Sequence, residues 1–149
     1  MQTMKFKLLN EGAEKTFAVV FDKGDEIIWR FRRFVTEQQL FASHFTAIGA
    51  LSDVVLGFFD PIRKQYKRIP IHEQVEVLSL IGDVTIEQGT IEVHAHVVVG
   101  KPDGTAHGGH LLEGHVFPTL ELILVESPGY LTRRRDIETG LALIDLKAA

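Results

Sequence analysis

The segment from Gly89 to Glu126 reads GTIEVHAHVVVGKPDGTAHGGHLLEGHVFPTLELILVE, and the rest of the chain is interpreted around it. Two stretches rich in apolar and β-branched residues, 90–99 and 115–125, flank the turn signal Lys101-Pro102-Asp103-Gly104. Two such runs joined by a glycine-containing turn predict a β-hairpin. The same segment holds five of the chain's seven histidines. The hairpin is therefore the first candidate for a functional site.

His94 and His96 lie two residues apart in the first predicted strand. Because side chains alternate between the two faces of a strand, both imidazoles point the same way, about 6.6 Å apart along it. The hairpin folds the Gly-Gly-His segment that ends at His110 back beside this strand. Three imidazoles with one coordination position left for water are typical of an open zinc site. The alternative is that the histidines are ordinary packed or solvent-facing side chains.

The composition limits the class of protein. A chain of 149 residues fits one domain, which we place over residues 1–149. It contains no cysteine, so any metal must be held by histidine and carboxylate ligands. No apolar run approaches the length of a membrane span, and the N-terminal residues lack the apolar segment of a signal peptide, so we expect a cytoplasmic protein. The net charge of −4 argues against strong non-specific binding to nucleic acid.

The N-terminal third predicts a strand followed by helix. Residues 15–21 (KTFAVVF) have the composition of a strand, and apolar residues recur at helical spacing through 26–34. Thr36 with Gln39 has the form of a capping box, which predicts a second helical segment over 37–42. The two segments are either one broken helix or two helices that meet at a corner.

The remaining segments predict mostly strands. Gly82-Asp83 is interpreted as a turn, and Pro70 restricts the strand before it to a short or edge position. The chain is therefore predicted to be α+β, with one largely antiparallel sheet of six to eight strands and one or two helices after the second strand. The predicted strands are about 52–59, 64–69, 74–81, 84–87, 90–99, 115–125 and 141–146.

The segments GALSDVVLGFFD (49–60), EVLSLIGDVT (76–85) and HAHVVVGKPDGTAHGGHLLEGHVFPTLELIL (94–124) together resemble the PPC domain, the "plants and prokaryotes conserved" domain. The resemblance extends over a core of about residues 15–146. It implies an α+β fold that assembles as a homotrimer. It also implies that zinc is bound by histidines of the His-x-His and Gly-Gly-His segments, which here are His94, His96 and His110.

The resemblance raises DNA as a partner, because prokaryotic relatives are named for DNA binding and the plant proteins carry AT-hook motifs. This sequence contains no Arg-Gly-Arg-Pro core of an AT-hook. Among basic residues, Arg133, Arg134 and Arg135 are candidate phosphate contacts, although acidic residues flank them. We therefore expect weak DNA binding, and a protein or small-molecule ligand is an equally open partner.

Four further residues are weighed against the histidine cluster. His107 is either a substitute ligand for His110 or an exposed loop histidine. His115 is expected to be packed or hydrogen-bonded. Glu113 and Glu121 can each orient a ligand imidazole through its second nitrogen, as metal-bound histidines usually require. Glu121 is preferred because burial in an apolar strand would be costly without a partner, but a salt bridge to a neighbouring subunit explains it equally well.

Two functions of different classes follow from these residues. The first is a non-enzymatic, trimeric PPC-domain protein that binds DNA, a protein or a small molecule. The second is a zinc-dependent enzyme or small-molecule sensor that uses an open three-histidine site. We favour the first, because the only candidates for a general acid or base beside the histidines are Glu113 and Glu121.

Overall fold

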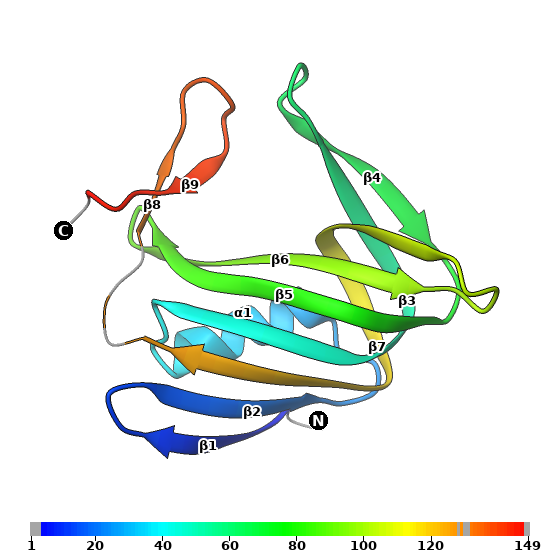
Figure 1. The fold of residues 1–149 in the computed structure, drawn as a ribbon, viewed down its shortest axis with the longest axis horizontal. Helices are drawn as coiled ribbons and strands as arrows, with labels where there is room; N and C mark the ends of the chain where they lie inside the picture. Colours follow the sequence, from blue (N-terminus) through cyan, green and yellow to red (C-terminus); the bar gives the residue numbers. More distant parts are fainter. Residues whose placement is uncertain (1–3, 128, 130–131, 148–149) are drawn as a thin grey trace.

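The computed structural model describes residues 4–127, 129 and 132–147, in which the chain forms nine strands and one helix (Figure 1). In chain order these are β1 (Lys5–Glu11), β2 (Lys15–Phe21), α1 (Ile27–Glu37), β3 (Ser43–Asp60), β4 (Gln65–Ile71), β5 (Val75–Glu87), β6 (Thr90–Gly100), β7 (Ala106–Glu126), β8 (Thr132–Arg135) and β9 (Ala142–Ile144).

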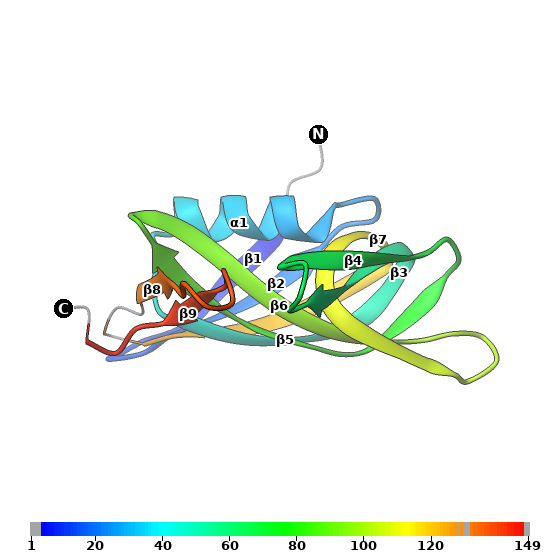
Figure 2. The ribbon, with the colours of Figure 1, turned by 90° about the horizontal axis from the view of Figure 1, so that it is seen from above.

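The strands form one sheet in the order β1-β2-β7-β3-β5-β8-β9. In addition, β4 pairs with β3, and β6 pairs with both β5 and β7. All these pairings are antiparallel except that between β5 and β8. Because β3 and β6 each pair with both β5 and β7, these four long strands close into a ring, and Figure 2 shows the resulting curl of the sheet. The predicted α+β class and antiparallel sheet are confirmed.

The helix α1 lies over one face of the sheet (Figure 2). The side chain of Glu26 caps it by accepting hydrogen bonds from the amides of Ile28 (3.3 Å) and Trp29 (2.7 Å). The aromatic rings on its inner face pack into the core, and Phe31 meets Phe45 of β3 edge to face, with ring centroids 4.7 Å apart. The buried residues of the helix are Ile27, Phe31, Phe34 and Val35.

The predicted second helical segment over 37–42 is wrong. The helix ends because Gln39 adopts a positive φ of 55°, and the amide of Leu40 then bonds the carbonyl of Val35 (2.9 Å). The hydroxyl of Thr36 donates to the carbonyl of Arg32 within α1 and caps no new helix. The pattern at residues 36–39 thus belongs to a helix C-terminus.

Two strands are longer than the sequence pattern predicts. Each continues through a glycine at which the backbone of a neighbouring strand approaches closely. A Cβ at Gly49 would lie 2.2 Å from the carbonyl oxygen of Thr119 in β7, and one at Gly82 would lie 2.2 Å from that of His94 in β6. β3 therefore begins at Ser43, well before position 52, and β5 runs through the expected turn to Glu87. This continuation places Asp83 directly opposite His94 in the β5–β6 register.

The sheet face turned away from α1 carries exposed apolar side chains. Their exposed fractions are 63% for Ile48, 54% for Leu78, 53% for Ile81 and 45% for Ile123. These residues adjoin one another, because Thr46 of β3 pairs with Ile81 on one side and with Ile123 on the other. Within the described part of the chain, no helix is long and apolar enough to span a membrane.

Candidate metal centre

Three imidazoles converge on the β6–β7 pairing. His94 and His96 extend from the same side of β6, and His110 of β7 is the direct cross-strand partner of His96. One ligand nitrogen from each ring can be chosen so that all three lie within 4.8 Å of one another, and the Nε2 atoms of His94 and His96 are 3.1 Å apart. The three side chains can therefore hold one metal ion between them.

Burial lowers the pKa of two of these imidazoles. It lowers the pKa of His110 from 6.5 to about 4, with smaller effects from the neighbouring His94 and His96. The pKa of His94 is also lowered, mainly by burial, although the charge of Asp83 acts in the opposite direction. In addition, Nδ1 of His110 is buried without a hydrogen-bond partner among the described residues. Neutral rings and an unpartnered buried nitrogen are the properties that a metal ion requires of its ligands.

A carboxylate that the sequence analysis missed, Asp83, lies opposite His94 in the β5–β6 register. Asp83 accepts two hydrogen bonds from Nη2 of Arg133, at 2.7 and 3.0 Å. The guanidinium of Arg133 is further fixed by bonds to the hydroxyl of Thr85 (2.8 Å) and the carbonyl of Ala142 (2.7 Å). Asp83 escaped notice because Gly82-Asp83 has the composition of a turn. Only the β5–β6 register shows that it faces a histidine.

The predicted supporting residues lie elsewhere. Glu113 forms an ion pair with Arg68 (3.2 Å), and Glu121 is exposed on the outer sheet face. His107 opposes Val99 at the start of β7, not in a loop, and its exposed ring contacts the hydroxyl of Thr105 (3.2 Å). Within the described residues, the group of convergent donors contains none of these three.

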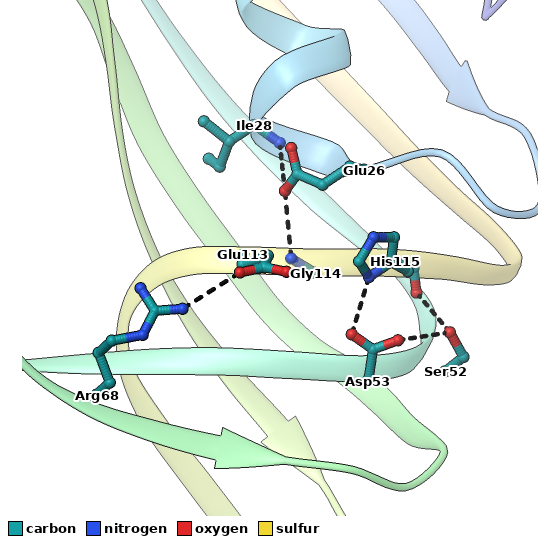
Figure 3. Close-up of polar contacts among 8 residues, drawn as sticks. All are labelled: Glu26, Ile28, Ser52, Asp53, Arg68, Glu113, Gly114 and His115. Atoms are coloured by element: carbon teal, nitrogen blue, oxygen red, sulfur yellow. Dashed lines mark hydrogen bonds and ion pairs between the residues drawn. The ribbon is translucent and has the colours of Figure 1, made fainter.

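His115 belongs to a separate polar network, which is shown in Figure 3. Its Nδ1 lies 2.9 Å from Oδ1 of Asp53, and this hydrogen bond is the main reason why the pKa of His115 is raised. Ser52 donates to the other oxygen of Asp53 (3.0 Å), and Glu26 reaches across from the start of α1 to the amide of Gly114 (3.3 Å). The network connects α1, β3 and β7, and His115 is hydrogen-bonded there.

The predicted phosphate-binding arginines all have acidic partners. Arg133 is paired with Asp83, as described above, while Arg134 lies 3.4 Å from Asp145. Arg135 lies 3.4 Å from Glu87 and also donates to the carbonyl of Gly140. These ion pairs fix β8 against β5 and β9 and reduce the charge that the cluster offers to a phosphate.

A pocket of about 350 Å³ opens beside the histidines. The ring of Tyr66 covers one side of His110, with centroids 4.6 Å apart and planes inclined by 35°. The β3–β4 and β8–β9 hairpins project from the same side of the molecule (Figure 1), and Nζ of Lys64 donates to the carbonyl of Ile137 at 3.4 Å. The lining residues are Arg32, Tyr66, Glu87, Glu92, Val93, His94, His110, Arg133, Leu141, Ala142 and Leu143.

The family model of the Plants and Prokaryotes Conserved (PCC) domain matches residues 9–128, which include all three convergent histidines. The chain belongs to the PCC domain family. This PCC domain is similar to the crystal structure of a putative DNA-binding protein from Bacteroides thetaiotaomicron, with a TM-score of 0.90 and 25% identity over 98% of this chain and 99% of that one. The metal-containing protein from Archaeoglobus fulgidus matches with a TM-score of 0.81 and 31% identity over 97% and 99% of the two chains.

A longer protein also contains a related segment. The PCC domain is 29% identical over 135 residues to the bifunctional protein GlmU of a Synechococcus strain. The match covers 89% of this chain but only 20% of that protein. The similarity therefore concerns one part of that relative and carries none of its activity to this chain.

Proposed function

We propose that this PCC domain binds one zinc ion through His94, His96 and His110 and acts as a trimeric, non-enzymatic binding or regulatory protein. The observation that carries the proposal is the convergence of three imidazole nitrogens within 4.8 Å of one another. Three histidines without a thiolate suit zinc and leave one coordination position open. A bound zinc ion would supply a Lewis-acidic position for a small ligand. One structural relative is itself named as metal-containing.

Binding is favoured over catalysis because the acids around the histidines are held by arginines. Asp83 is paired with Arg133 and Glu92 with Arg32, whose Nη2 lies 2.9 Å from the carboxylate. A carboxylate whose oxygens already accept hydrogen bonds from a guanidinium is not positioned to act on a substrate. The pocket beside the histidines nevertheless supports a second candidate, a zinc-dependent sensor of a small molecule.

Zinc titration of untagged protein, followed by calorimetry and elemental analysis, tests the metal site. We expect one zinc ion per chain, and we expect His94→Ala, His96→Ala or His110→Ala to remove most of the affinity, because two ligands hold zinc poorly. His44→Ala and His72→Ala are matched controls, since both residues are exposed and lie outside the cluster. Wild-type affinity no higher than that of the three cluster variants would exclude the site.

Self-association is supported by the exposed apolar face formed by Ile48, Leu78, Ile81 and Ile123. Contiguous apolar surface of this kind marks an interaction site in a water-soluble protein. A second copy of the chain is the partner that the PCC family resemblance implies, with three copies in the assembly.

DNA is the weaker candidate partner, although one structural relative is named as a putative DNA-binding protein. The net charge is −4, and the arginines of β8 are held in ion pairs. We expect a dissociation constant for duplex DNA above about 1 μM at physiological salt. Titrations at several salt concentrations measure it, and tighter binding that falls steeply with salt would contradict the expectation.

A further inference from the structure

The pocket beside the three histidines is lined by both polar and apolar residues. His94 and His110 supply polar lining, while Leu141, Ala142 and Leu143 of the β8–β9 hairpin supply apolar lining. Its volume of about 350 Å³ is at the small end of the range typical of ligand-binding pockets. The side chain of Leu143 remains 47% exposed there, so apolar surface is available for a ligand to cover.

The charges around the pocket cancel one another before any metal is added. Three carboxylates, those of Asp83, Glu87 and Glu92, are each paired with one guanidinium, which belong to Arg133, Arg135 and Arg32 respectively. The three pairs therefore carry no net charge. A divalent ion on the histidines would therefore bring two positive charges that no protein carboxylate in these pairs offsets. Such a charge in a partly buried site favours an anionic ligand at the open coordination position.

The remaining hydrogen-bond donors favour a carboxylate over a phosphate. All three nitrogens of the Arg133 guanidinium already bond to Asp83, Thr85 or the carbonyl of Ala142. Arg32, at the rim, donates from Nη2 to Glu92 (2.9 Å). A phosphate needs several donors around it, whereas a monoanion needs only the metal and this one rim guanidinium.

We propose that the pocket binds a small organic carboxylate whose anionic group takes the open position on the metal and whose apolar tail packs against Leu141 and Leu143. This inference rests on the proposed zinc site and names the class of ligand that the site would bind. The ring of Tyr66, which packs on His110, also lines the pocket.

Cobalt(II) in place of zinc provides a test, because its visible absorption changes with its ligands. Cobalt is first titrated into the untagged full chain without added anion, and hexanoate, acetate, inorganic phosphate or 1-hexanol is then added. We expect one cobalt per chain and a spectral change with hexanoate at a concentration at least tenfold lower than with acetate, since each buried methylene strengthens binding about fourfold. Phosphate should bind more weakly than hexanoate, and 1-hexanol, which lacks the carboxylate, should leave the spectrum unchanged.

Variants of the apolar lining separate ligand binding from metal binding. Leu143→Asp should reduce the affinity for hexanoate at least tenfold with unchanged cobalt affinity, whereas Leu143→Met should retain it. Leu146→Asp is the matched control, since Leu146 is 87% exposed in the same C-terminal segment and does not line the pocket. Unchanged cobalt affinity also shows that each variant folds.

The outcomes distinguish the two proposals. Failure to bind cobalt overturns both the metal site and the ligand that depends on it. Cobalt binding with equal affinities for hexanoate and acetate, or with tighter binding of phosphate, overturns the organic carboxylate alone. An unchanged affinity for hexanoate in the Leu143→Asp variant overturns the placement of the tail.

Discussion

An imidazole half-buried beside two others resists taking up a proton, and His110 is in this position. Its pKa is lowered to about 4, while in the unfolded chain it titrates near 6.5. Between these values the unfolded state binds more protons than the folded state, so the free energy of unfolding of the metal-free protein falls as pH falls. His94 contributes in the same direction, because its pKa is lowered too.

The direction of this pH dependence gives a first prediction. Urea unfolding of the metal-free protein should show stability that decreases from pH 6.5 towards pH 4, and a smaller decrease in His110→Gln, which lacks the group. Nitrogen-15 NMR of the ring should show His110 neutral at pH 5.5. Titration of His110 near its ordinary pKa would contradict the prediction, and zinc binding would then weaken at a correspondingly higher pH.

A second prediction at the scale of residues concerns Asp83. The acid opposes His94 across the β5–β6 pairing and affects its pKa. We expect Asp83→Asn to lower zinc affinity about 10- to 100-fold, as loss of a group behind a ligand usually does. Asp53→Asn is the matched control, because Asp53 pairs with His115 outside the cluster. Calorimetry below the unfolding transition measures the zinc affinity of both variants. Equal zinc affinities would show that Asp83 holds Arg133 in place and does not support the metal site.

Part of the secondary structure could be predicted from the sequence pattern alone. Alternation along 90–99 was enough to place His94 and His96 on one side of a strand, and the helical spacing of 26–34 located α1. Neither pattern carries cross-strand register. The choice of His110 as third ligand therefore came from the family resemblance and the predicted hairpin, and its pairing with His96 is seen only in the structure.

The predicted turn at Gly82-Asp83 was wrong for a related reason. Glycine beside aspartate is common in turns, but glycine is also required where two strands approach closely. Distinguishing the two needs the position of β6, which lies far along the chain. The same ambiguity concealed the N-terminal half of β3 around Gly49.

The close approach at Gly82 gives a prediction at the scale of elements. A Cβ there would lie 2.2 Å from the carbonyl oxygen of His94 and 2.5 Å from the ring of Phe45. We expect Gly82→Ala to destabilise the protein by about 1–3 kcal/mol and to weaken zinc binding, because β6 must shift and carries two of the histidines. Gly129→Ala is the control, since no atom of the described residues lies within 4 Å of its added Cβ. Urea unfolding that shows equal stability for both variants would contradict this account.

At the scale of the whole molecule, the two faces of the sheet differ in how far they are covered. α1 covers one face and completes the core, whereas Ile48, Leu78, Ile81 and Ile123 on the other face remain in water in a single copy. Ile81 is also the cross-strand partner of His96, so the exposed apolar face reaches the edge of the histidine cluster. Assembly through this face would therefore bring a neighbouring copy close to the metal centre.

The last prediction tests that assembly. We expect sedimentation equilibrium at micromolar concentration to give three times the chain mass of 16.7 kDa. Ile81→Glu should shift the mass to that of one chain, because a charge at the centre of an apolar interface is not paired. Trp29→Glu is the matched control, since Trp29 is 54% exposed, as Leu78 is, but lies on the helix side. A wild-type monomer would refute the trimer, and an equal effect of both substitutions would place the interface elsewhere.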